Sequence, residues 1–187
     1  MTTVNISTAT GDLYGRAVGP VLDNSGGTIE LGKIASDPCK AWIPFVVPLL
    51  NSTVLVSATL KLVANTSRSG TTGKLRFGCV AVDDASAPGT WAALNALTMT
   101  TAYTDDDSVA AQTAGVEYTW NITTAVQEII NRAGWASGNT IGVLIFENGG
   151  DNATQRTLAS YDNETYTEPI LSIDYYSGGQ YILWSNE

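Results

Sequence analysis

Carboxylates are the side chains with which this chain could do chemistry, because histidine is missing altogether. The sequence has 18 Asp and Glu residues, 9 Lys and Arg residues and no His, which gives a formal net charge of −9. Without histidine the chain cannot carry a Ser-His-Asp or Cys-His catalytic arrangement or a His-ligated zinc ion. The negative charge disfavours nucleic acids and anionic membranes, both of which bind clustered Lys and Arg. We therefore expect neither of them as a partner.

The acidic residues gather in short groups, among them the run Asp105, Asp106 and Asp107. Calcium takes about six to eight oxygen ligands from acidic loops, so a structural calcium ion is one interpretation of this run. The alternating spacing of a calcium loop is missing, however, and loop aspartates also serve turns. A carboxylate pair can hydrolyse a glycoside, but nothing in the sequence places two carboxylates at the required separation. We expect no enzyme, no catalytic residue and no cofactor other than this calcium candidate.

Aromatic side chains raise the possibility of sugar binding, because flat rings stack on sugar rings. The chain has 5 Trp and 8 Tyr residues. Trp42 and Trp120 lie within strand patterns, which predicts that they belong to the core. Trp91 lies in a predicted loop and could form a glycan platform with Tyr103 and Tyr161. The alternative is that these three rings pack inside the protein or at an interface.

The last eleven residues, 177–187, contain a concentrated apolar segment behind a Ser-Gly-Gly hinge. Its apolar residues are Tyr181, Ile182, Leu183 and Trp184. A soluble domain does not leave such a patch in water. The segment therefore either folds back onto its own domain or docks on a neighbouring protein as an added strand or anchor. The polar residues 1–10 could act as a similar arm.

Strand patterns dominate the rest of the chain. Short apolar stretches, several of them alternating, are bounded by Gly, Asn and Ser turns, which predicts an all-β, jelly-roll-like β-sandwich. Pro44 within one of these stretches favours an edge strand or a bulge. The predicted strands cover residues 28–34, 41–46, 54–63, 74–82, 116–120, 140–146, 156–161 and 170–176.

One short helix interrupts the strand pattern. Val126, Ile129 and Ile130 are spaced i, i+3 and i+4, which places them on one helical face. Thr124 and Gln127 have the spacing of a capping box. These signals predict a helix over about residues 124–133, with its apolar face on the sandwich.

The run from Val126 to Asn139, VQEIINRAGWASGN, resembles the VQEI-NR-GW-SGN signature of a family of jelly-roll modules. These modules occur in bacterial surface and secreted proteins and in phage-encoded proteins, and they are similar to carbohydrate-binding modules. The resemblance extends over about residues 10–176 and implies the fold more than any one function. The motif also has a mechanical interpretation, in which Glu128 pairs with Arg132 along the helix and Trp135 closes one end of the sandwich.

Cys39 and Cys79 allow one disulfide, although two buried free thiols are the favoured interpretation. The first residues show neither the basic nor the apolar region of a secretory signal peptide. The longest apolar run, residues 41–50, is broken by two prolines and is too short to span a bilayer.

These observations divide the chain into an N-terminal arm (1–10), a β-sandwich domain (11–176) and a C-terminal tail (177–187). Together with the resemblance they favour a non-enzymatic virion structural protein of a bacteriophage, either a head decoration protein or a tail or fibre component. Such a protein would be made in the host cytoplasm and would contact other virion or capsid proteins and copies of itself. The alternative is a carbohydrate-binding module that recognises a polysaccharide of the host surface.

Overall fold

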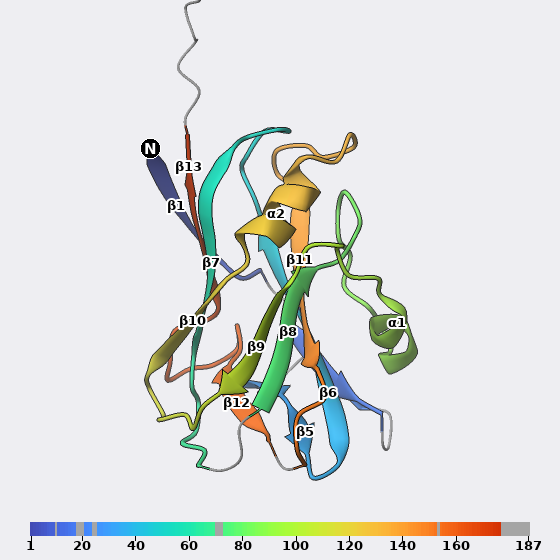
Figure 1. Ribbon diagram of the computed structural model, residues 1–187, viewed down its shortest axis with the longest axis vertical. Coiled ribbons are helices and arrows are strands. Elements are labelled where there is room, and N and C mark those ends of the chain that lie inside the picture. Colours follow the sequence, from blue (N-terminus) through green and yellow to red (C-terminus); the bar gives the residue numbers. More distant parts are fainter. Residues whose placement is uncertain (10, 18–20, 24–25, 70–72, 153, 177–187) are drawn as a thin grey trace, which may run out of the picture.

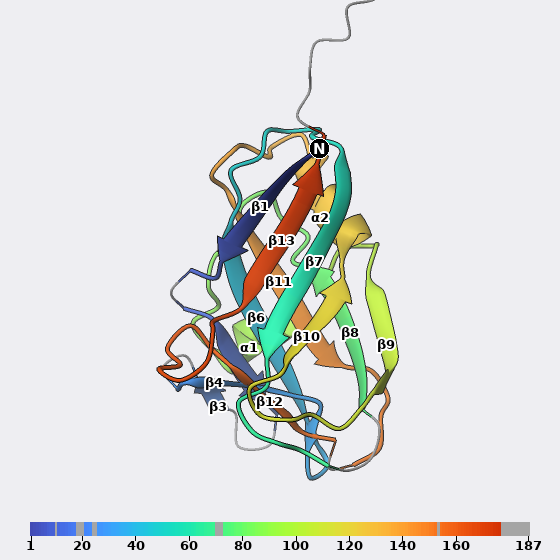
Figure 2. The same cartoon turned by 90° about the vertical axis from the view of Figure 1, so that its left-hand side faces the viewer.

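Two antiparallel β-sheets face each other in a computed structural model of the chain (Figure 1 and Figure 2). The structure describes residues 1–9, 11–17, 21–23, 26–69, 73–152 and 154–176. Strands predominate, and the two helices are short. The predicted all-β sandwich is therefore confirmed.

The elements are grouped by sheet. The four-stranded sheet has the order β1 (Thr2–Ser7), β13 (Ile170–Tyr175), β7 (Leu55–Val63) and β10 (Glu117–Asn121). The seven-stranded sheet has the order β3 (Val21–Asp23), β2 (Leu13–Arg16), β6 (Asp37–Val46), β11 (Thr140–Glu147), β8 (Gly73–Cys79) and β9 (Thr104–Val109), with β5 (Lys33–Ile34) paired to β6. A two-stranded sheet pairs β12 (Arg156–Ala159) with β4 (Thr28–Leu31). The helices are α1 (Trp91–Ala96) and α2 (Thr123–Ile130).

The main core lies between the two large sheets, because each strand points alternate side chains inward. Leu60 of β7 and Val143 of β11 are fully buried within it. The rings of Phe77 and Trp120 stack with centroids 4.7 Å apart. A second, smaller core lies on the outer face of the seven-stranded sheet, where α1 packs over Trp42. Both Trp42 and Trp120 are buried, as predicted.

The first residues form a strand of the sandwich, and the predicted separate arm is not observed. Val4 pairs with Ile173 in β13, so β1 is an edge strand of the four-stranded sheet. Val4 and Ile6 are half-buried against the main core. The alternation of these β-branched residues with polar ones is the pattern of a strand with one covered face.

Pro44 lies in β6, which is an interior strand and not the predicted edge. Its partner in β11 is Gly142, while the pairing of β2 with β6 stops at Trp42. On the side that β2 leaves open, the carbonyl of Pro44 accepts hydrogen bonds from the Thr8 hydroxyl and the Ala9 amide. A proline fits here because this side requires no N–H donor from residue 44.

Helix α2 covers residues 123–130, which is shorter than predicted, and the capping box does not form. The N-cap residue is Ile122, and no side chain caps the helix. Gln127 instead bonds to the chain before β7: its Oε1 accepts from the Leu55 amide at 2.8 Å and its Nε2 donates to the Thr53 carbonyl at 2.9 Å. The spacing of the apolar residues correctly predicted where the helix lies. The side chain of Gln127, however, bonds to the start of β7 and the residues before it and does not cap the helix.

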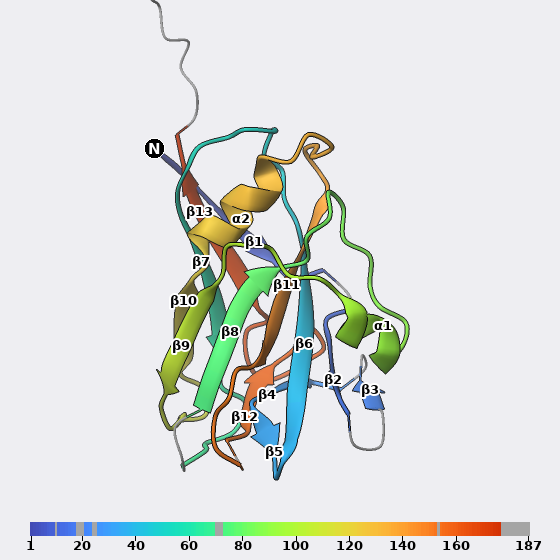
Figure 3. The same ribbon diagram turned by 45° about the vertical axis from the view of Figure 1, so that its right-hand side comes forward.

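The remaining polar residues of the motif also attach α2 to neighbouring loops. Glu128 accepts hydrogen bonds from the amides of Thr101 and Ala102, and Arg132 forms an ion pair with Asp83 at 2.5 Å. The predicted Glu128–Arg132 pair is therefore wrong. Trp135 is buried in the main core and donates from Nε1 to the Leu49 carbonyl at 2.9 Å. It follows α2, which lies near one end of the sandwich (Figure 3). The motif thus holds loops against the helix.

Helix α1 was not predicted. Its N-cap is Thr90, whose hydroxyl accepts a hydrogen bond from the Ala93 amide at 3.1 Å. With only six residues the helix shows one buried apolar side chain, Leu94, which is too little periodicity to detect in the sequence.

Cys39 and Cys79 are both buried free thiols, which confirms the favoured interpretation. Burial raises the pKa of Cys39 to about 12 and raises that of Cys79 as well, so neither has thiolate character at neutral pH.

Candidate binding face

A row of four side chains crosses the outer face of the seven-stranded sheet. Phe146 of β11 pairs with Lys40 of β6 on one side and with Arg76 of β8 on the other, and Arg76 pairs with Asp105 of β9. The inward-pointing neighbours of these residues, such as Ala41, belong to the main core. Strand alternation therefore directs the four residues outward. We refer to them as the cross-strand row.

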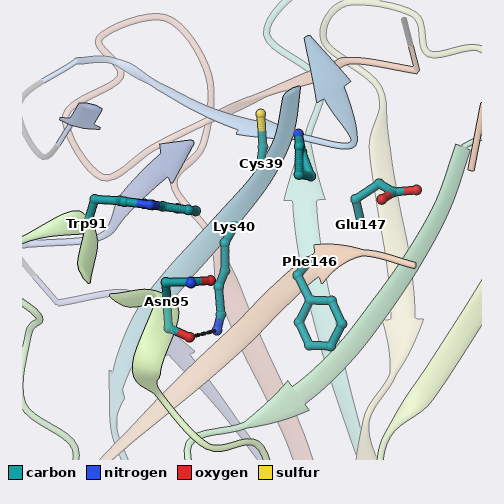
Figure 4. A pocket seen from close by; sticks show the side chains of 7 residues that line it. Cys39, Lys40, Trp91, Asn95, Phe146 and Glu147 are labelled. Atoms are coloured by element: carbon teal, nitrogen blue, oxygen red, sulfur yellow. Dashed lines mark hydrogen bonds between the residues drawn. The ribbon is translucent and has the colours of Figure 1, made fainter. Parts of the chain in front are cut away.

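A hollow of about 270 Å³ lies beside the Lys40 end of the cross-strand row (Figure 4). Helix α1 contributes Trp91 and Asn95 to its wall, and the sheet contributes Lys40 and Phe146. Backbone and side chains of Pro38, Cys39 and Glu147 complete the lining. The hollow is thus built between a helix and the open face of a sheet.

Helix α1 is held in this position by the smaller core. Leu94 is fully buried and packs in one cluster with Trp42 of β6 and Leu144 of β11. Trp91, one helical turn earlier, is only half-buried and packs at the margin of the same cluster. The indole is therefore anchored by the core, while part of it remains available at the hollow.

At the far end of the row, the ion pair of Arg76 and Asp105 lies against the ring of Tyr103. Arg76 forms a bidentate pair with Asp105, with two N–O distances of 2.7 Å. This hydrogen bonding raises the pKa of Arg76 and lowers the pKa of Asp105. The guanidinium carbon also lies 3.8 Å from the ring centroid of Tyr103. The positive charge of Arg76 is thus already neutralised by the carboxylate of Asp105.

Lys40 differs from Arg76 because no ion pair to it is found in the described part of the chain. Its ammonium donates to the backbone carbonyl of Asn95 at 3.2 Å and lies 5.7 Å from the ring centroid of Phe146. Burial lowers the pKa of Lys40. The nearby carboxylate of Glu147 pairs with Lys33 at 3.5 Å. Lys40 therefore brings a positive charge to the hollow.

Two of the three predicted glycan-stacking residues lie along this face. Trp91 lines the hollow at one end of the row, and Tyr103 lies against Arg76 at the other end. Tyr161 follows β12, and its amide donates to Asp12 at 2.8 Å. It belongs to the loop beyond the two-stranded sheet and does not join the row.

The three aspartates proposed for calcium all lie in strand β9 and not in a loop. Asp105 points outward to Arg76, whereas Asp106 accepts a hydrogen bond from the buried Trp120 indole at 2.9 Å. Asp107, the third of them, is exposed. Among the residues that the structure describes, no three His, Cys, Asp or Glu side chains gather closely enough to hold a metal ion. A calcium site here stays a prediction to which the arrangement of β9 adds no support.

A separate apolar patch lies at the end of the sandwich where β13 finishes. Its members are exposed large side chains on adjacent segments. The Tyr176 amide donates to the Val54 carbonyl, and Thr2 pairs with Tyr175. Tyr176 and Val54 are each 60% exposed. We define this patch, Met1, Leu50, Val54, Val56 and Tyr176, as the apolar end.

The predicted docking residues Tyr181, Ile182, Leu183 and Trp184 lie outside the described residues. Tyr176, the last described residue, belongs to the apolar end. The sequence patterns predicted contact segments in the tail and in residues 1–10, but not the exposed residues Leu50, Val54, Val56 and Tyr176. The three consecutive apolar residues 54–56 were the available signal, but they do not show which of their side chains is left uncovered.

Lys40, Arg76 and Phe146 were not predicted from the sequence as binding residues. Phe146 and Arg76 are seventy positions apart in the printed sequence, and Lys40 is further still from Phe146. Only the strand register brings the three together. No spacing pattern within one segment could have indicated the row.

The chain was compared with protein-family models and with curated proteins, and neither comparison found a match. None of the described helices is long and apolar enough to cross a membrane.

Proposed function

We propose that the chain is a non-enzymatic virion structural protein of a bacteriophage, a head decoration protein or a tail or fibre component. Its partners would be other virion or capsid proteins and copies of itself. The observation that carries this proposal is the apolar end, whose exposed apolar side chains lie at or next to the start of β1, the start of β7 and the end of β13. Exposed apolar side chains at one end of a domain favour a contact with protein.

The edge strand β1 supports the same proposal. Its six residues lack Pro and Lys, the side chains that commonly protect a sheet edge. One backbone edge of β1 pairs with β13, and β1 is the last strand on that side of the sheet. A partner strand added there would lie directly beside the apolar end.

Particle attachment of variants tests this proposal. In Val54→Asn combined with Tyr176→Ser, we expect the chain content of purified particles to fall at least about tenfold, because the contact loses its apolar side chains. The matched control is Val116→Asn, which changes a 44% exposed valine beside Glu117, the partner of Val63 at the far end of β7. Equal particle content for both variants would contradict a role for the apolar end.

The cross-strand row favours a second function, binding of a carbohydrate on the host surface. Trp91 and Phe146 offer ring faces at one hollow, with hydrogen-bonding groups of Asn95 beside them. Concave sites that combine aromatic surfaces with a few polar groups are typical of small-ligand recognition. The two functions are compatible, because the apolar end and the hollow share no residue.

A further inference from the structure

The hollow contains a positive charge that the protein does not neutralise with a carboxylate of its own. Within the described part of the chain, Lys33, Arg76 and Arg132 each pair with an acidic side chain. The ammonium of Lys40 has instead one backbone carbonyl at 3.2 Å and the face of Phe146. An ammonium partly removed from water without an acidic partner gains more from an incoming anion than an exposed one does.

We propose that the hollow binds a saccharide ring that carries a carboxylate, with Lys40 pairing the carboxylate and Trp91 stacking on the ring. This inference rests on the carbohydrate-binding function proposed above, and it names the class of sugar. Figure 4 shows the indole of Trp91 and the amide of Asn95 on the helix side, facing Lys40 and Phe146 on the sheet side. A ring bound in the hollow would lie next to the Trp91 indole, the Asn95 amide and the Lys40 ammonium, which all line it.

The size of the hollow agrees with one sugar ring. Its volume of about 270 Å³ is just below the range of roughly 300–1,000 Å³ typical of sites for drug-sized ligands. Further rings of a polysaccharide would therefore extend over the open sheet. The continuation of that face is the rest of the cross-strand row, from Phe146 through Arg76 to Asp105.

Charge favours a carboxylate over a phosphate. A carboxylate has a single negative charge, whereas a phosphate monoester has roughly −1.5 to −2 at neutral pH. Lys40 offers one positive charge, and the guanidinium of Arg76 is already paired with Asp105. The surplus charge of a phosphate would face a chain whose net charge is −9. The single ammonium matches the single charge of a uronic or sialic acid ring.

The test uses the full chain on an array of oligosaccharides that carry uronic acids, sialic acids, phosphate groups or no charge. We expect binding to the carboxylated members, with methyl esterification of the carboxylate lowering affinity at least about tenfold. Lys40→Gln should cause a similar loss, and it should remove most of the salt dependence. Trp91→Ala should weaken binding to acid and ester alike, because it removes the stacking surface.

Lys61→Gln is the control, because Lys61 is a half-exposed lysine of β7 on the other large sheet. It should leave binding unchanged, and thermal unfolding of every variant checks that the fold is intact. Equal affinity for acid and methyl ester, or a preference for phosphate, would overturn the carboxylate inference while sugar binding stands. Binding to no member of the array would overturn the inference together with the carbohydrate function on which it rests.

Discussion

Asp12 is a buried carboxyl group whose environment opposes its charge. The side chain is 3% exposed, and one of its oxygens accepts a hydrogen bond from the Tyr161 amide while the other has no hydrogen-bond partner among the described residues. Burial raises the pKa of Asp12 from 3.8 to about 6, and the Tyr161 hydrogen bond offsets part of this effect. The folded state therefore holds a proton that the unfolded chain has already released between these two pH values.

The pKa of Asp12 predicts the direction of a pH dependence. A raised pKa in the folded state means that stability decreases as pH rises from about 3.8 to about 6 and is then constant with respect to this group. Asp12→Asn should accordingly raise the free energy of unfolding by up to about 3 kcal/mol near pH 8, with the gain falling below about 1 kcal/mol near pH 4.

Urea unfolding of Asp12→Asn at several pH values measures this difference. Asp151→Asn serves as control, because Asp151 is an exposed loop aspartate. A stability gain for Asp12→Asn that is the same at pH 4 and pH 8 would show that burial of the charge is not its cause.

Helix α2 shows how a short element depends on side chains that reach beyond it. Gln127 bonds to both the Leu55 amide and the Thr53 carbonyl, at the point where β7 begins. Gln127→Ala should lower the free energy of unfolding by about 1 to 3 kcal/mol, because it leaves partly buried backbone groups without partners. Thr124 is exposed and does not cap the helix, so Thr124→Ala should change stability by less than about 0.5 kcal/mol.

Thermal or denaturant unfolding of the two variants decides between the two interpretations of this motif. If Thr124 and Gln127 formed a capping box, both alanine variants would lose comparable stability. A large loss for Gln127→Ala alone is the outcome that the tertiary hydrogen bonds predict.

At the level of elements, the sequence predicted what depends on local periodicity. The strand patterns from residue 54 to 63 and from 140 to 146 correspond to β7 and β11, and the apolar spacing of Val126, Ile129 and Ile130 correctly located α2. The elements that were overlooked are β1, β2, β3, β9 and α1, all of six residues or fewer. The acidic run Asp105–Asp107 does not have the sequence pattern of a strand. It nevertheless forms part of β9, which is held by its pairing with β8 and by the Arg76–Asp105 contact.

The candidate binding face was less predictable than the fold because it depends on register. Trp91 and Tyr103 were selected for their ring chemistry, and both lie along the cross-strand row. Lys40 and Phe146 lie more than a hundred positions apart in the sequence and meet only because β6 and β11 pair at those residues. A shift of that register by one residue would turn Phe146 into the core and remove the row.

On the scale of the whole molecule, two different surfaces are separated on one sandwich. The apolar end lies where β13 finishes and β1 begins, and Figure 2 shows these two strands side by side. The hollow lies against the outer face of the other large sheet, under α1. This separation would let a particle-bound copy present its hollow to a host surface while the apolar end is covered by a neighbour.

Counting the chain in purified virus particles tests the proposed virion function most directly. Quantitative mass spectrometry of gradient-purified particles, from a culture in which the chain is produced, gives the number of copies per particle. A structural component is predicted to be present at a fixed, reproducible number, on the order of tens to hundreds of copies for a symmetric assembly. Its absence from particles that contain the other virion proteins would contradict the account.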